Sequence, residues 1–319
     1  MHDHPKFEQP IYDLIHQIEQ LKNSTDGTCV NTSEQITALN KKLDSITQSI
    51  YKSLSPWQIV QLARHPLRPK ALDVIDSLFD SFFQLHGDRH LADCQSIIGG
   101  IARFNQLPIM VLAQHKGRDI NERVKHNFGM ANPEGYRKCK RLMLLAEKFN
   151  LPVVCFIDTP GAYPGIDAEK HNQCEAIANN LMTMSNLKTP IVSIVLGEAM
   201  SGGAIAMGVA DRVLMMEYAI YSVISPEGCA SILWKDTEMA QHAAESMNLT
   251  APDLLQAKII DSIIKEPIGG AHRNHKQCIE TIRHTLTSEL NLLTQNNNET
   301  LVNQRQQKLR NLTSNYYAL

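Results

Sequence analysis

The strongest constraint on the fold is a regular alternation of short β-branched runs with amphipathic segments between about residues 95 and 268. The runs predict six strands, at 96–104, 108–114, 152–158, 190–196, 212–216 and 219–222. The segments between them predict helices at 134–149, 170–185 and 202–210. Apolar strands that alternate with helices are typical of an α/β layered structure with a buried sheet. The sequence therefore predicts an α/β fold.

Composition excludes several classes of protein. The 319 residues include 31 Lys and Arg against 33 Asp and Glu, so no excess positive field attracts a polyanion, and we expect no nucleic-acid partner. The seven cysteines never lie within four residues of each other, and no HExxH motif occurs, so we expect no metal site in this chain. No apolar run of about 18 residues and no apolar leader are found, so we expect a cytoplasmic protein without membrane association.

The chain divides into three predicted parts. Residues 1–55 carry two apolar stripes at helical spacing around a turn-forming segment, which predicts a helical hairpin acting as a docking or oligomerisation arm. A capping box at Thr32–Gln35 is expected to begin its second helix. A single narrow stripe forms no core alone, so the hairpin is expected to lie on the main body or on a partner subunit. Residues 56–275 form the main domain, and 276–319 a C-terminal helix with a loose polar tail.

The loop after the strand at 190–196 predicts an oxyanion-binding site. It ends in Ser201-Gly202-Gly203, directly before a predicted helix. Ser201 is expected to cap that helix and to leave the backbone amides of Gly202 and Gly203 free at its positive end. Two such amides stabilise negative charge that develops on an oxygen, each by about 3 to 4 kcal/mol when well placed. Close packing of helix against sheet is the alternative reason for small residues here.

The loop after the strand at 152–158 predicts a wall for a flat ligand. Two prolines and two glycines within residues 158–165 give a rigid turn that exposes backbone amides and one aromatic ring. An ordinary strand-to-helix turn is the alternative, although it needs fewer special residues. We expect the following residues to line a pocket for an uncharged heterocycle: Gly161, Ala162, Tyr163, Pro164 and Gly165.

Two further segments supply charged and polar candidates. Ser225 or Ser231 can cap the helix after the strand at 219–222, and Glu227 can orient a neighbouring group or act as a base. A capping or surface role is the alternative for that carboxylate. Lys116 and Arg118 flank a glycine after the strand at 108–114 and can hold a carboxylate, with a solvated loop as the alternative.

At these loops the sequence resembles the alpha subunit of the bacterial acetyl-CoA carboxylase carboxyltransferase. The resemblance extends from Phe7 to about residue 275, and its separate, ordered matches make it specific. They include QLARHP at 61–66, GGIAR at 99–103, NFGM at 127–130, PEGYRK at 133–138, DTPGAYPG at 158–165, SGG at 201–203 and GGAHR at 269–273. The resemblance implies the crotonase-like fold, a spiral of β-β-α units, with the helical hairpin as an N-terminal extension.

The resemblance also implies a reaction and partners. The family transfers the carboxyl group of carboxybiotin, carried on a separate biotin carrier protein, to acetyl-CoA, which gives malonyl-CoA for fatty-acid biosynthesis. The implied partners are a zinc-containing beta subunit in an alpha2beta2 heterotetramer, the carrier protein and biotin carboxylase. In this family Gly202 and Gly203 would hold the ureido oxygen of biotin. The loop 161–165 would line the biotin slot with Ser225 and Glu227, while Lys116 and Arg118 would contact the transferring carboxylate.

Departures from the family pattern leave two alternatives open. Ala199-Met200 replaces a Gly-Gly pair, His171-Asn172 replaces an Arg-Gly pair, and Cys174 replaces a serine. A bulky but flexible Met200 predicts a reshaped slot. One alternative function is a crotonase-fold serine hydrolase or peptidase that uses Ser201, although the sequence identifies no base for it. The other is a non-catalytic scaffold subunit.

Overall fold

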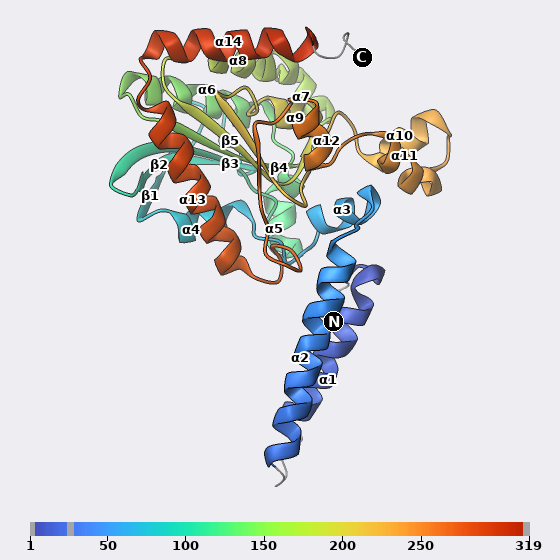
Figure 1. Ribbon diagram of the computed structural model, residues 1–319. Helices are drawn as coiled ribbons and strands as arrows, with labels where there is room; N and C mark the ends of the chain where they lie inside the picture. The colour runs from blue at the N-terminus through green and yellow to red at the C-terminus, as the bar shows by residue number, and fades with distance from the viewer. Residues whose placement is uncertain (1–3, 24–28, 315–319) are drawn as a thin grey trace.

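The computed structural model describes residues 4–23 and 29–314 of the chain, and eight strands in that part form one mixed sheet (Figure 1). Its order is β1-β2-β3-β4-β5-β6-β8, with β7 paired to β5. The first three strands are antiparallel and the others are parallel. The bounds are β1 Ser81–Gln84, β2 Ile97–Phe104, β3 Leu107–Gln114, β4 Val153–Thr159, β5 Ile191–Met200, β6 Arg212–Met216, β7 Ile220–Ser222 and β8 Ser262–Ile264.

The predicted α/β fold is confirmed, and the six predicted strands correspond to β2 through β7. Strands β4 and β5 are buried along their whole length, which explains why their sequences show no polar alternation. The sequence pattern does not reveal β1 and β8, because these strands at the two ends of the sheet have four and three residues. A run that short carries almost no periodic signal.

Helices cover both faces of the sheet (Figure 1). Helices α6 (Pro133–Lys148) and α8 (Gln173–Asn186) lie over one face, and α4 (Ala71–Leu78) and α13 (His275–Leu293) over the other. Among the residues described, no helix combines the length and the apolar character needed to cross a membrane. The shorter helices are α3 Pro56–Ala63, α5 Ile120–Lys125, α7 Ile166–Lys170, α9 Ser201–Ile205, α10 Pro226–Leu233, α11 Ala240–Ser246 and α12 Ala251–Gln256.

Helices α1 (Gln9–Asn23) and α2 (Cys29–Tyr51) lie side by side and project away from the sheet (Figure 1). Near the main body, Ile11 and Tyr51 pack against Leu62 of α3. The expected capping box at Thr32–Gln35 is wrong, because α2 already begins at Cys29 and Thr32 lies inside the helix. The loop between the two helices falls within residues 24–28, outside the described part of the chain.

Four buried polar side chains meet where the N-terminal segment contacts the main body. The Tyr51 hydroxyl donates a hydrogen bond to Glu8 Oε1 at 2.7 Å, and His272 Nε2 lies 3.3 Å from the same oxygen. The rings of His65 and His272 are 4.1 Å apart. These groups are buried and out of reach of bulk water, so they depend on each other for hydrogen bonds. The contacts fix the end of the hairpin that meets the main domain.

The C-terminal region contradicts the expectation of a loose polar tail. Residues Asn298–Ser314 form helix α14, which packs beside α8 (Figure 1). Leu301 and Arg305 of this helix are buried at 1% exposure each. The Arg305 guanidinium binds Asp211 at 2.8 Å and donates to the carbonyl oxygens of Met184, Leu187 and Thr189. Leu301, Arg305 and Lys308 thus hold to the main body a helix whose sequence is mostly polar.

Candidate functional site

Two glycine-bearing loops meet at the carboxyl edge of the parallel strands. The loop 158–165 follows β4, and α9 follows the neighbouring strand β5. A Cβ added to Gly203 would lie 2.6 Å from the carbonyl carbon of Gly161 and 2.7 Å from the nitrogen of Ala162. Real Cβ atoms do not approach backbone this closely, so only glycine fits at position 203. The close packing offered as an alternative reason for small residues is therefore real at Gly203.

The buried side chain of Gln114 joins the two loops. Its Nε2 donates to the carbonyl oxygen of Gly203 at 2.7 Å, and its Oε1 accepts from the amide of Asp158 at 3.2 Å. Sequence reasoning gave this residue no role. The signal was a polar residue that ends an otherwise apolar strand, β3, at the sheet edge where ligands bind.

Helix α9 presents its first amides beside this contact. The structure corrects the expected cap, because Met200 is the N-cap residue and no side chain caps the helix. Ser201 turns the chain from strand to helix with a φ of 55°, and its side chain is exposed. The amides of Gly202 and Gly203 fall in the first turn, where an α-helix offers no internal acceptor. Their position is therefore suited to binding an oxygen that carries negative charge.

Met200 does not occupy this edge of the site. It is buried at 1% exposure in a small cluster with Val60, Ile220 and Leu249. Its side chain therefore fills space between β5, α3 and β7, where a flexible thioether packs well. The Ala199-Met200 departure from the family pattern therefore changes the packing between β5, α3 and β7, next to the glycine loops.

The loop 158–165 is rigid, but several of its amides are already used. The Gly161 amide donates to the Thr159 hydroxyl at 3.0 Å, and the Tyr163 amide donates to the carbonyl of Ala131 at 3.1 Å. The Tyr163 ring lies against Gly165, where an added Cβ would be 2.4 Å from the ring. Nothing lies within 4 Å of a Cβ built on Gly161, whose φ is 144°. The loop therefore leaves open space next to Gly161 instead of an array of free amides.

Lys116 is buried in an ion cluster, which contradicts its expected role as a free carboxylate ligand. Its Nζ lies 2.8 Å from Asp158 Oδ1 and 2.7 Å from Glu198 Oε1. Burial opposes the charged form, but the two carboxylates outweigh burial and raise the pKa of Lys116. The lysine holds the ends of β4 and β5 together and has no free charge to offer a substrate.

Arg64, which sequence reasoning missed, extends this cluster to the segment after β7 that contains Ser225 and Glu227. Its Nε lies 2.7 Å from Glu198 Oε2 and its Nη1 lies 2.6 Å from Glu227 Oε1. Burial favours the neutral form of Glu227, but the hydrogen bond from Arg64 outweighs it and lowers the pKa of this carboxyl. Glu227 therefore orients Arg64, as one interpretation predicted, and is not poised as a base. Ser225 caps α10 by accepting from the amide of Gly228 at 3.1 Å.

Arg118 is paired away from the glycine loops. Its Nη2 lies 2.6 Å from Asp73 Oδ1 on α4, and its side chain is 48% exposed. The cluster of Arg64, Lys116, Asp158, Glu198 and Glu227 carries a formal charge of −1, so it offers no unpaired cation. Negative charge at this edge is best stabilised by the backbone amides of α9.

Glu198 is expected to make stability pH-dependent in acid. Burial acts to raise its pKa, but the charges of Lys116 and Arg64 lower it to about 2 from 4.5. A carboxyl whose pKa is lowered by folding stabilises the folded chain fully at pH values above its pKa in the unfolded chain. That stabilisation is lost as the pH falls through its pKa in the folded chain. Between pH 4.5 and about 2, the free energy of unfolding of Glu198→Gln should therefore fall less steeply than that of the unsubstituted chain. Urea denaturation at a series of pH values measures both slopes, and parallel slopes would contradict the assignment.

One cluster of the described residues has the composition of a metal site. Ligand atoms of Glu8, His65 and His272 all lie within 4.8 Å of one another, and the three residues are buried. Glu8 Oε2 and His65 Nε2 have no hydrogen-bond partner. The cluster lies at the base of the hairpin and shares no residue with the glycine loops. The absence of a metal site stays a prediction.

Comparison with known proteins assigns the family. A family model described as acetyl co-enzyme A carboxylase carboxyltransferase-like matches residues 4–313. The acetyl-coenzyme A carboxylase carboxyl transferase subunit alpha of Azotobacter vinelandii is 53% identical, over 95% of this chain and 96% of that protein. The protein of the same name from Alcanivorax borkumensis is 52% identical, over 95% and 94%. The chain belongs to this family.

Solved structures of carboxyltransferases share the fold. Transcarboxylase 12S has a TM-score of 0.57 at 20% identity and matches 70% of this chain and 41% of that chain. The beta subunit of geranyl-CoA carboxylase from P. aeruginosa has a TM-score of 0.57 at 14% identity, over 76% and 45%. The chain therefore has the crotonase-like fold that the sequence resemblance implied.

The family assignment gives no support to a serine hydrolase. Within the described residues, the Ser201 side chain makes no hydrogen bond with a histidine or a carboxylate that would activate it. A serine nucleophile needs such a base within hydrogen-bond reach.

Proposed function

We propose that this chain is the carboxyltransferase alpha subunit that transfers the carboxyl group from carboxybiotin to acetyl-CoA. The observation that carries the proposal is the contact of Gly203 with the Gly161–Ala162 peptide, beside the free first turn of α9. It joins the loops 158–165 and 201–203, at both of which the sequence resembles the family. The proposed product is malonyl-CoA, the precursor for fatty-acid synthesis, made in the cytoplasm.

The residues present fit the ureido ring of biotin. A flat ring needs open space next to backbone donors, and both features occur here. A Cβ on Gly161 would meet nothing within 4 Å, and one on Gly202 would meet only Ile177 Cδ1 at 3.4 Å. We therefore place the ring between the loop 161–165 and the first turn of α9, with Tyr163 at its border.

In this mechanism carboxybiotin supplies the activated carboxyl group when its carrier protein delivers it. The chain would contribute electrostatic stabilisation: the amides of Gly202 and Gly203 would donate to the ureido oxygen as it gains negative charge. Gln114 holds the carbonyl oxygen of Gly203, in the peptide unit next to these donors, and so restrains the start of α9. Arg64, Lys116 and their carboxylates keep the strand ends in register and take no part in proton transfer.

An exposed apolar surface on the segment after β7 and on α10 supports the proposal that a beta subunit binds this chain. Val223 is 81% exposed, and Ile232 and Leu233 of α10 are 69% and 64% exposed. Exposed apolar side chains that lie together, as on this lobe formed by the segment after β7 and α10, are typical of a surface that another chain covers. We place the beta subunit, with the proposed zinc site and acetyl-CoA site, against this lobe.

Reconstitution tests the proposed function directly. The purified chain is mixed with a family beta subunit, a carboxybiotin donor and acetyl-CoA, and malonyl-CoA is measured. We expect turnover that requires both chains and that survives Ser201→Ala, because the serine has no proposed role. No malonyl-CoA from two folded chains would contradict the function, and labelling of Ser201 by a fluorophosphonate probe would favour the hydrolase instead.

A further inference from the structure

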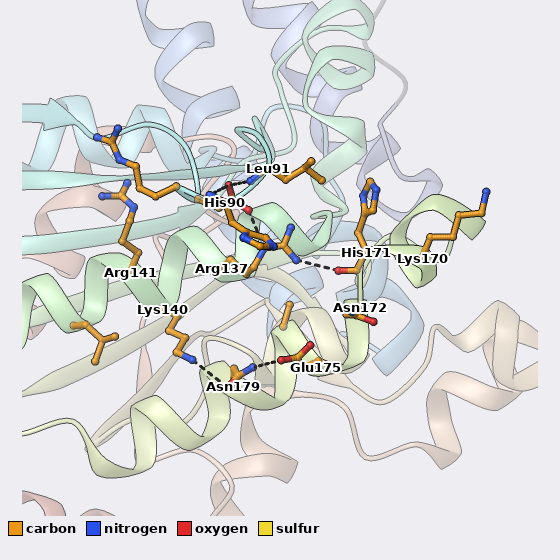
Figure 2. Close-up of a pocket in the computed structure, with 14 residues that line it drawn as sticks. His90, Leu91, Arg137, Lys140, Arg141, Lys170, His171, Asn172, Glu175 and Asn179 are labelled. Carbon is orange, nitrogen blue, oxygen red and sulfur yellow. Dashed lines mark hydrogen bonds and ion pairs between the residues drawn. The ribbon is translucent and has the colours of Figure 1, made fainter.

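A cleft away from the two glycine loops concentrates positive charge (Figure 2). It has a volume of about 640 Å³ and lies between α6, α8 and the segment 88–91. Residues 161–165 and 201–203 are not part of its lining. Its charged lining residues are Arg89, Arg137, Lys140, Arg141 and Lys170, with Asp88 and Glu175.

The two acidic residues of the cleft are already engaged. Asp88 Oδ1 accepts the amides of His90 and Leu91 at 2.9 and 2.8 Å, and its Oδ2 accepts from Arg137 Nε at 2.8 Å. Glu175 Oε1 accepts from the side-chain amide of Asn179. Of the five cations, Arg137 is paired with Asp88 and with Glu134 outside the lining, and five cations against two carboxylates leave the lining a net formal charge of +3.

Three of the other cations have no carboxylate partner within the described residues. Arg89 is exposed and makes no hydrogen bond or ion pair there. Lys140 donates to the amide oxygen of Asn179 at 3.1 Å, and Arg141 donates to the carbonyl oxygens of Gly87 and His86 at 3.1 Å. Burial and then the nearby charge of Arg89 lower the pKa of Arg141, and they outweigh the opposing charges of Asp93 and Asp88.

The fourth cation adds to this excess. Lys170 Nζ is 3.7 Å from Asp167, in a pair whose side chains are 69% and 85% exposed. Water screens such a pair, so Lys170 remains available to a stronger anion. A ligand with two or three negative charges would complement the cleft.

The cleft also offers apolar surface next to these cations. Leu91 is 56% exposed and Leu144 is 47% exposed. Its volume falls in the range of about 300 to 1,000 Å³ that is typical of small-molecule sites. A ligand that matches both features carries phosphates and a flat, partly apolar ring.

We propose that this cleft binds a phosphorylated nucleoside, with its phosphates on Arg89, Lys140 and Arg141 and its base against Leu91 and Leu144. Two sources share this chemistry: a free nucleoside diphosphate, and the adenosine 3′,5′-bisphosphate end of a coenzyme A molecule bound apart from the acetyl-CoA site that we place with the beta subunit. The second source rests on the proposed function, whereas the first does not.

Calorimetric titration of the full chain tests the proposal with three probes: 5′-ADP, adenosine 3′,5′-bisphosphate and inorganic pyrophosphate. We expect at least one nucleotide to bind saturably, one per chain, and pyrophosphate to bind about tenfold more weakly because it has no base. Preference for the 3′,5′-bisphosphate identifies the coenzyme A end, and preference for 5′-ADP identifies a free nucleotide. Affinity should fall as salt increases.

Two matched variants locate the binding. Arg89→Gln removes a cation with no partner in the described chain, so the fold should be unaffected, and the Kd should rise about tenfold, as expected for one charge-assisted contact. Arg103→Gln removes an exposed arginine of β2 outside the cleft and should leave the Kd unchanged. No saturable nucleotide binding, equal effects of the two variants, or equal binding of pyrophosphate would overturn the proposal. Because these titrations involve no turnover, they are independent of the carboxyltransferase assay.

Discussion

Replacing Gly203 with alanine is expected to lower kcat for malonyl-CoA formation about a hundredfold or more. The new methyl group would lie 2.6 Å from the Gly161 carbonyl carbon, so α9 and the loop 161–165 must separate. Loss of one correctly placed oxyanion donor alone costs about a hundredfold to a thousandfold in rate. Steady-state assays of the reconstituted alpha–beta complex measure the effect.

Gly202→Ala provides the matched control for this prediction. Its methyl group would meet only Ile177 Cδ1, at 3.4 Å, and its amide is retained. We therefore expect a much smaller loss of kcat than for Gly203→Ala, together with a raised KM for the carboxybiotin donor, because the methyl group enters the space proposed for the ring. Thermal unfolding and co-purification with the beta subunit establish that both variants are folded and assembled. A rate for Gly203→Ala equal to that of the unsubstituted complex would show that the contact between the loops is irrelevant to the reaction and would support the scaffold interpretation.

Replacing Lys116 with methionine is expected to lower the free energy of unfolding by about 3 to 5 kcal/mol. The substitution removes a buried cation and leaves Asp158 and Glu198, which are 4% and 7% exposed, without its charge. The penalty arises mainly from the buried Asp158, which loses its ion pair, while Glu198 keeps only its pair with Arg64. Denaturant titration at pH 7 measures it.

Arg118→Met is the control from the same loop. Its partner Asp73 lies on α4, and the arginine side chain is 48% exposed. Exposed ion pairs contribute about 0 to 1 kcal/mol, so this variant should be close to the unsubstituted chain. If the two substitutions destabilised the chain equally, the cluster around Lys116 would not be the support that its burial indicates.

Local sequence patterns were sufficient to predict most of the sheet. Strands β4 and β5 are buried throughout, and the resulting apolar runs are long enough to stand out. The position of Gly202 and Gly203 was also predictable, because a glycine pair after a buried strand has few structural explanations. The short edge strands β1 and β8 and the polar helix α14 contain no long apolar run and no glycine pair that would reveal them. Helix α14 was missed because its few buried residues, Leu301 and Arg305 among them, give it a weak amphipathic pattern.

The charged support of the site could not be predicted from local patterns. Arg64 and Glu198 are 134 residues apart in the sequence, and Arg64 and Glu227 are 163 apart. Which carboxylate a cation contacts depends on the completed fold, and spacing carries no information about it. The local pattern therefore predicts that Lys116 binds a substrate carboxylate, whereas its charge is paired with Asp158 and Glu198 of the same chain.

The position of Arg305 sets an order on folding during translation. Every other element of the described fold is synthesised before α14. Until residue 305 emerges from the ribosome, Asp211 and the three carbonyl groups that it binds have no such partner. The strands can pair earlier, but the contacts of Arg305 with the turn that leads into β5 form only after residue 305 has been made.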